Sequence, residues 1–108
     1  MRVELLWWQG CPSHEQALAE LRDALVDLGH DPAIAEARQI ESDEDAEREE
    51  FPGSPTIRVD GSDLFKPGPT DVVGLSCRVY RLRDGRPSPT PDPQDLRDAL
   101  ARFATARS

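Results

Sequence analysis

The 108-residue chain lacks the long apolar segment that a membrane protein needs. No run approaches the ~20 apolar residues that make a transmembrane helix. The N-terminal stretch, MRVELLWWQG, has too short an apolar run and too early a glutamate for a signal peptide. We therefore expect a cytoplasmic protein that has no membrane partner.

Cysteine is scarce as well, since the chain has only Cys11 and Cys77. In a cytoplasmic protein, two cysteines indicate free thiols or a redox pair rather than a structural disulfide. A chain of this length can bury a modest core without disulfides, so we expect a single domain over residues 1–108.

Basic residues are outnumbered: 13 Lys and Arg against 21 Asp and Glu give a net charge of -8. Such a chain lacks the concentrated basic face that phosphate contacts require, and we expect no nucleic-acid partner. Much of the acid lies in ESDEDAEREE, residues 41–50, which indicates a solvated helix face or, alternatively, a partner-binding patch. A glycine-rich phosphate loop and a dinucleotide fingerprint are also missing.

The segments that are present alternate between strand and helix patterns. Apolar residues on both faces of residues 3–8 predict a central strand, with Val3, Leu5 and Trp7 on one face. Leucines spaced three and four apart predict a helix over residues 12–28, which Gly29 ends. Further strands are predicted over residues 33–40, 56–60 and 77–82. A helix is predicted over residues 42–50, with Ser42 and Asp45 as a capping box. A last helix is predicted to be capped by Asp92, with Pro93 at its first position. The sequence therefore predicts an α/β fold, a four-stranded mixed sheet flanked by helices in the order βαβαββα.

Cys11 lies in the stretch GCPSH, between the first predicted strand and the first predicted helix. With Cys11 at the N-cap and Pro12 at the first helical position, free backbone N–H groups and the helix dipole favour a thiolate. His14, one turn along, would be close enough to touch the sulfur and to strengthen this effect when protonated. Cysteines in such settings have pKa values lowered from ~8.5 to ~3.5–7.5, and a thiolate is the nucleophile of disulfide exchange. The alternatives are a small buried cysteine and an ordinary polar histidine.

GCPSH after a strand, with GSPTIRVDG further along the chain, resembles the thioredoxin-like superfamily in its short, glutaredoxin-sized form. The resemblance implies a thioredoxin-like fold over nearly the whole chain, Cys11 as the nucleophile, and a cis-proline at Pro55 followed by Thr56. In that family a Cys-Pro-x-Cys motif opens the first helix, and here His14 stands at the position of the second cysteine. This departure favours monothiol chemistry: glutathione mixed disulfides, sulfenic acid, or capture of metals and electrophiles.

We expect a substrate to bind beside the Cys11 thiol, where Ser54 and Pro55 face it. A cis bond costs little only before proline, and at Pro55 it would turn the Ser54 backbone toward the sulfur. An extended peptide or glutathione could pair with that backbone. The predicted substrate is therefore a thiol or disulfide, either glutathione or a protein, and the predicted substrate-binding residues are Pro12, Ser54, Pro55 and Thr56.

Cys77 is the candidate second thiol. In the predicted sheet it begins the fourth strand and pairs near Asp60, more than ~10 Å from the end where Cys11 lies. A disulfide needs Cα atoms within ~7 Å, so this geometry favours a buried small residue instead. The long loop over residues 61–76 leaves open a fourth strand that starts nearer to Cys11.

Three functions follow from these features. The first is a monothiol redox or thiol-transfer protein, and the second is a thioredoxin-fold binding module without catalysis. A third arises because GSPTIRVDG and LSCRVYR also resemble sequences labelled alkylmercury lyase, an enzyme that cleaves a carbon–mercury bond with two thiolates and a carboxylate proton donor. Cys11 and Cys77 would supply the thiolates, and Asp63 or Asp71 the carboxylate.

A metal centre is the remaining alternative. Cys11, His14 and Cys77 would be a soft ligand set suited to zinc or copper. It lacks a fourth obvious ligand, and the distance argument for Cys77 applies here too. We therefore expect neither a metal nor another cofactor.

Overall fold

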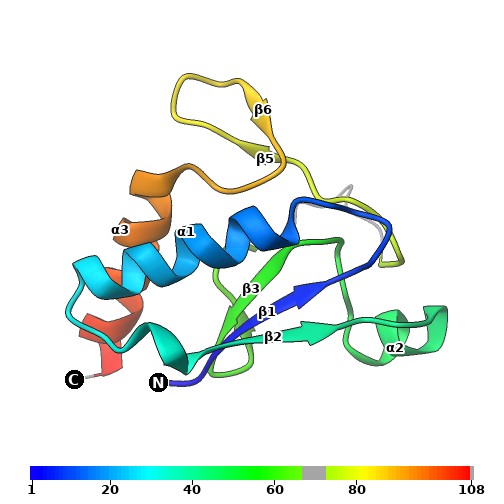
Figure 1. The fold of residues 1–108 in the computed structure, drawn as a ribbon, viewed down its shortest axis with the longest axis horizontal. Helices are drawn as coiled ribbons and strands as arrows, with labels where there is room; N and C mark the ends of the chain where they lie inside the picture. Colours follow the sequence, from blue (N-terminus) through cyan, green and yellow to red (C-terminus); the bar gives the residue numbers. More distant parts are fainter. Residues whose placement is uncertain (67–72, 108) are drawn as a thin grey trace.

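A four-stranded mixed sheet organises the protein, whose computed structural model describes residues 1–66 and 73–107 (Figure 1). The sheet order is β2-β1-β3-β4, with β1 parallel to β2 and antiparallel to β3, and with β3 antiparallel to β4. Its strands are β1 (Val3–Trp7), β2 (Ala35–Gln39), β3 (Thr56–Val59) and β4 (Ser62–Asp63). The helices are α1 (His14–Asp27), the short 3-10 helix η1 (Pro32–Ile34), α2 (Asp43–Arg48) and α3 (Pro93–Arg107). The α/β architecture and the mixed four-stranded sheet are as the sequence predicts.

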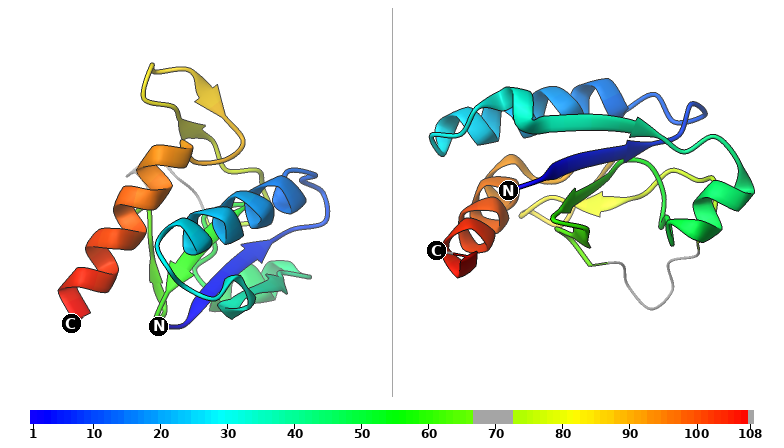
Figure 2. Two further views of the ribbon diagram at one scale, coloured as in Figure 1. Left: turned by 60° about the vertical axis from the view of Figure 1, so that its left-hand side comes forward. Right: turned by 90° about the horizontal axis from the view of Figure 1, so that it is seen from below.

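Helices α1 and α3 lie side by side against one face of the sheet (Figure 2). The predicted inward positions of β1, Val3 and Leu5, are fully buried there. They meet the apolar stripe of α1 and the buried leucines of α3, Leu96 and Leu100. This cluster is the main core, and it fixes the direction in which α1 starts.

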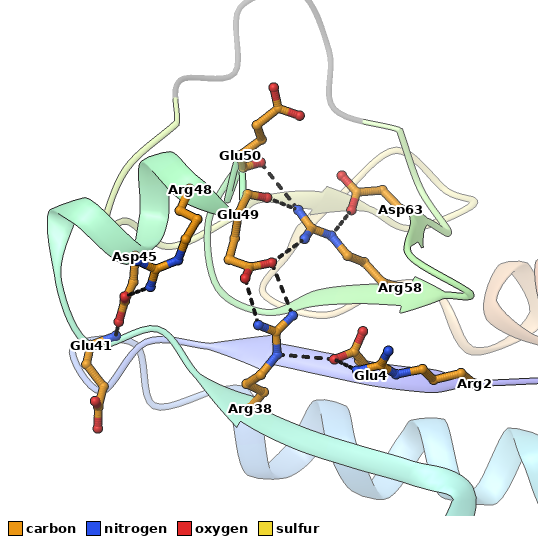
Figure 3. A network of polar contacts seen from close by, with 10 residues as sticks. All are labelled: Arg2, Glu4, Arg38, Glu41, Asp45, Arg48, Glu49, Glu50, Arg58 and Asp63. Atoms are coloured by element: carbon orange, nitrogen blue, oxygen red, sulfur yellow. Dashed lines mark hydrogen bonds and ion pairs between the residues drawn. The ribbon is translucent and has the colours of Figure 1, made fainter.

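The other sheet face is covered differently along its length. Near α2, a smaller cluster buries Leu6, Ile40, Ala46 and Phe51. Further along, charged side chains replace the apolar ones, and Figure 3 shows them as a continuous network. Arg38 bridges Glu4 (3.1 Å) and Glu49 (2.8 Å), and Arg58 contacts Glu49 (3.4 Å) and Asp63 (2.6 Å). Glu4 and Arg58 are almost fully buried, and ion pairing offsets their desolvation.

Several local signals of the sequence are confirmed. Gly29 ends α1 at φ +82°, its N–H donating to the Val26 carbonyl (3.0 Å), while the N–H of His30 donates to the Leu25 carbonyl (2.8 Å). This pair of bonds is the Schellman ending. The Ser42 hydroxyl caps α2 by accepting from the Asp45 N–H (3.1 Å). The side chain of Asp92 accepts from the first free N–H groups of α3, which begins at Pro93.

The start of α1 differs from the prediction. The N-cap is Ser13, whose carbonyl accepts the N–H of Ala17 (3.0 Å). Cys11 precedes it in a turn closed by its own N–H to the Trp8 carbonyl (3.0 Å). The positions predicted for Cys11 (N-cap) and Pro12 (first helical residue) are therefore wrong, because the chain completes this turn before it enters the helix.

The fourth strand also differs from the prediction. Asp60 and Gly61 both have positive φ, +51° and +85°, which gives a tight two-residue turn. The chain pairs back at once, so Asp63 lies opposite Arg58 and β4 takes the place beside β3. Residues 77–82 were expected there. Instead Tyr80–Arg81 (β5) pairs with Pro87–Ser88 (β6) in a ribbon that stands apart from the sheet (Figure 1).

No helix in the described part of the chain combines the length and apolar character of a membrane span.

Candidate functional site

The Cys11 sulfur lies between the start of α1 and the start of β3. Its Sγ is 3.5 Å from the Ser13 hydroxyl and 3.6 Å from the Ser54 carbonyl oxygen. The Ser54–Pro55 peptide bond is cis, as the resemblance implied, and Thr56 then opens β3. The juxtaposition of Cys11 with Ser54 and Pro55 is thus present, although Cys11 is only 4% exposed.

Ser54 is fully buried, and all of its polar groups are in use. Its hydroxyl accepts from the Trp8 N–H (3.1 Å). Its N–H donates to the Ser76 carbonyl (2.8 Å), and its own carbonyl accepts from the Arg78 N–H (2.8 Å). The backbone that was expected to hold a substrate is therefore paired with residues 76–78 of the same chain.

This pairing brings Cys77 to the site. Ser54 and Cys77 form an isolated parallel β-bridge, and the side chain of Cys77 lies close enough to Cys11 for each thiol to shift the pKa of the other. Cys77 is exposed. The prediction that Cys77 is buried and pairs near Asp60 is therefore wrong. Because β4 occupies the place beside β3, the chain that leads to β5 passes the N-terminal end of β3 instead.

Arg78 anchors this segment from within the protein. It is buried, its guanidinium donates to the Thr56 hydroxyl (3.4 Å) and to the Phe65 carbonyl, and it lies 4.8 Å from the centre of the Tyr80 ring. The Tyr80 hydroxyl in turn donates to the carbonyl of Pro55. The segment that follows the Ser54–Cys77 bridge is therefore fastened at Arg78 and at Tyr80.

Gly53 is the residue that permits this close approach. Its φ is +126°, a conformation that side-chain-bearing residues rarely adopt. A Cβ there would lie 3.1 Å from the backbone nitrogen of Arg78 and 3.1 Å from the hydroxyl of Ser76. Sequence analysis missed the parts played by Ser13, Gly53, Arg78 and Tyr80; the glycine before Ser-Pro was the only signal that could have been followed.

The two thiols differ in their tendency to ionise. Burial raises the pKa of the Cys11 thiol, but hydrogen bonds from Cys77, Ser13 and Ser54 outweigh burial and hold that pKa below its ordinary value. The hydrogen bond to Cys11, then burial and the charge on Cys11, raise the pKa of Cys77 to about 11. Cys11 therefore ionises first, and Cys77 keeps its proton and donates it to the Cys11 sulfur.

His14 does not take the place at the sulfur that the sequence suggested. Its Nδ1 lies 3.2 Å from the backbone carbonyl oxygen of Cys11, and its ring stacks on Trp7 with centroids 4.1 Å apart. The histidine thus fastens the turn that carries the cysteine. Pro12, also predicted at the site, is exposed between Cys11 and the N-cap.

Neither a metal centre nor a proton-donating carboxylate is assembled here by the described residues. Asp63 is held by Arg58 on the ionic face of the sheet, away from the start of β3. Asp71, the other carboxylate considered for a lyase, lies outside the described residues. Within residues 1–66 and 73–107, no group of three or more His, Cys, Asp or Glu side chains could hold a metal ion.

A shallow cavity of about 260 Å³ opens beside Cys77. It is lined by Cys77, Arg78, Val79, Pro87, Ser88 and Pro89, and Val79 is well exposed there. A larger cavity of about 500 Å³ lies on the ionic face, around Glu49, Arg58 and Asp63. Of these two cavities, only the one of about 260 Å³ is lined by a cysteine.

Comparisons with protein-family models, with curated proteins and with solved structures find no match for this chain. The chemistry must therefore be argued from the site itself. It consists of one sheltered thiol whose pKa is below its ordinary value, a second thiol whose pKa is raised to about 11, and a cavity that opens at the second thiol.

Proposed function

We propose that this is a thioredoxin-fold thiol protein, which carries out thiol–disulfide exchange or thiol transfer with Cys11 as its nucleophile. The observation that carries the proposal is the setting of the Cys11 sulfur. It lies opposite Ser54–Pro55, 3.6 Å from the Ser54 carbonyl oxygen. The side chains of Cys77, Ser13 and Ser54 lower the pKa of the Cys11 thiol and so favour a thiolate. The sheet order and the packing of α1 and α3 on one face support the thioredoxin-like fold.

The reaction begins with attack of the Cys11 thiolate on one sulfur of a disulfide, RSSR. The bond between Cys11 and that sulfur forms as the substrate's S–S bond breaks. The leaving thiolate takes a proton from water, and the protein is left with a mixed disulfide at Cys11. A second thiol that attacks this mixed disulfide returns Cys11 to its thiolate or completes the transfer.

The substrate that fits best is a compact disulfide such as oxidised glutathione. An extended peptide would need the backbone of Ser54, which Ser76 and Arg78 already occupy. A small disulfide needs only to reach the Cys11 sulfur. Binding of a protein substrate along Ser54 would require residues 76–78 to leave.

The test is the pH dependence of alkylation by iodoacetamide, followed at each cysteine by peptide mass spectrometry. The same chain unfolded in urea is the internal reference for an ordinary thiol. We expect the midpoint for native Cys11 to lie below the reference and the midpoint for Cys77 to lie above it. A native Cys11 that titrates with the unfolded reference, or that does not react at all, would contradict the proposal.

A binding module without catalysis is the second candidate, and two observations favour it. Cys11 is sheltered, and the backbone groups of Ser54 are used by the chain itself. In that case the thiol pair would be a structural contact. An unreactive native Cys11 in the alkylation experiment is the result expected of such a module.

A further inference from the structure

The Ser54 backbone is paired in the way expected of a bound substrate, but by the protein's own residues 76–78. Ser54 donates to Ser76 and accepts from Arg78, and Cys77 lies between these two contacts. Cys77 therefore occupies the position at which the reacting residue of an extended substrate would face Cys11.

The geometry suits a bond between the two sulfurs. Bridged residues on neighbouring strands lie ~4.8 Å apart, so Cys77 is next to Ser54, and the Cys11 sulfur is 3.6 Å from the Ser54 carbonyl oxygen. The two thiols are also close enough for each to shift the pKa of the other. Disulfides form across Cα separations of ~4.4–6.8 Å, a range compatible with two cysteines that both lie beside Ser54.

We propose that Cys77 is the built-in disulfide partner of Cys11, so that the protein alternates between a dithiol and a Cys11–Cys77 disulfide. This inference rests on the proposed function, because it needs Cys11 to react. It replaces the monothiol chemistry that the sequence favoured with a two-thiol cycle, in which the second thiol comes from residue 77 rather than from residue 14.

The cycle uses a low-molecular-weight disulfide as its oxidant. Cys11 attacks RSSR and releases the first RSH, which leaves a mixed disulfide at Cys11. Cys77 then loses its proton to water, and its thiolate attacks the Cys11 sulfur. The S–S bond to the second RS⁻ breaks, and this leaving group takes a proton from water to give the second RSH. Two electrons pass from the two protein thiols to the substrate, and two molecules of thiol reverse both steps.

Charge favours this order of events. Before the reaction, the thiolate at Cys11 holds the Cys77 proton in place. Once Cys11 is in a mixed disulfide it carries no charge, so the charge and the hydrogen bond that oppose ionisation of Cys77 are gone. The first step therefore prepares the nucleophile of the second.

Anchoring makes Cys77 a partner at high effective concentration. Arg78 and Tyr80 fasten the segment to Thr56, Phe65 and Pro55. The second thiol is therefore already held near Cys11 before the reaction begins. Val79 provides a matched control, since it is exposed on the same segment two residues further on. A cysteine at that position keeps the number of thiols but lacks the contact with Ser54.

The experiment equilibrates four proteins in buffers of reduced and oxidised glutathione: wild type, Cys77→Ser, Cys11→Ser, and the double variant C77S/V79C. Acid quenching, alkylation of free thiols and intact-mass measurement then count internal disulfides and glutathione adducts. We expect wild type to form a monomeric internal disulfide and Cys77→Ser to stop as a glutathione adduct on Cys11. The double variant should form an internal disulfide with an equilibrium constant at least tenfold lower.

Failure of this inference is distinct from failure of the proposed function. A glutathione adduct that persists on Cys11 of wild type while Cys77 stays free overturns the built-in partner and leaves thiol transfer intact. Disulfide-linked dimers in place of the internal bond, or an equally good bond in C77S/V79C, also overturn it. Absence of any reaction at Cys11 in wild type and in Cys77→Ser overturns both.

Discussion

Substitution of Gly53 by alanine should disturb both the stability and the thiol pair. The φ of +126° costs a side-chain-bearing residue ~1–3 kcal/mol. The new Cβ would also lie 3.1 Å from the Arg78 nitrogen and 3.2 Å from its Cα, and the backbone must move to relieve this contact. Weakening the Arg78 N–H bond to Ser54 adds ~0.5–1.5 kcal/mol. We therefore expect Gly53→Ala to lower the free energy of unfolding by roughly 2–4 kcal/mol.

Gly29→Ala is the matched control. Gly29 also has a positive φ, +82°, but a Cβ there would meet no atom within 4 Å. Its cost is then the conformational term alone, ~1–2 kcal/mol. Both variants are measured by urea unfolding of the reduced protein. For m-values of ~1–3 kcal/mol/M, the midpoint of Gly53→Ala should fall by about 0.7 M or more.

The contact with Arg78 gives the prediction a second readout. Gly53→Ala should reduce formation of the Cys11–Cys77 disulfide in glutathione buffer, whereas Gly29→Ala should leave it unchanged. Equal losses of stability in the two variants, together with an unchanged disulfide in Gly53→Ala, would refute the claim that Gly53 exists to admit residues 76–78.

Three further predictions follow from the site and from the ionic network. Ser13→Ala removes a hydrogen bond to the Cys11 thiolate and should raise the pH midpoint of Cys11 alkylation. His14→Ala should shift that midpoint less, because the imidazole bonds the Cys11 carbonyl rather than the sulfur. A larger shift in His14→Ala than in Ser13→Ala would contradict this geometry. The pKa of Cys77 is raised from 9.0 to about 11 on folding, so its contribution to stability is present below pH 9 and is lost as the pH rises to about 11. Urea unfolding of reduced wild type, compared with Cys77→Ser, should show that extra alkaline loss in wild type only. Finally, Arg58→Met leaves Asp63 without its guanidinium and leaves Glu49 with Arg38 alone, and it should cost ~3 kcal/mol in chemical unfolding. The alkylation midpoint of Cys11 should not change. A loss below ~1 kcal/mol would show that the network contributes little.

Much of the fold could be predicted because its signals are local. The burial of Val3 and Leu5 follows from alternation along one strand, and the ends of α1 and α2 follow from Gly29 and Ser42. Each of these features depends on residues within a few positions of one another. Helix caps and strand faces can therefore be predicted from short stretches of sequence.

The fourth strand could not be predicted in this way. Its two residues, Ser62 and Asp63, are polar and too few to show any period, while residues 77–82, CRVYRL, form a longer run with the strand-favouring residues Val79 and Tyr80. The turn at Asp60 and Gly61 was recognisable, but not the immediate return of the chain. Residues 77–82 were therefore assigned to the position beside β3, which β4 holds.

The thiol site was predicted in part. Local sequence placed Cys11 near the start of a helix, and the resemblance placed it opposite Ser54–Pro55. The exact helix start and the expected contact of His14 with the sulfur were wrong. The position of Cys77 depends instead on backbone bonds between distant residues and on the guanidinium of Arg78, which binds a carbonyl and a hydroxyl. Such contacts leave no periodic signature, and so the meeting of the two thiols was missed.

Access and reactivity are divided between the two cysteines. Solvent reaches Cys77, which holds its proton, whereas the sulfur that ionises is covered. A bulky electrophile that collides with this surface meets the poorer nucleophile of the two. We therefore expect small reagents to modify Cys11 faster than bulky ones, because a large molecule reaches a covered sulfur less easily.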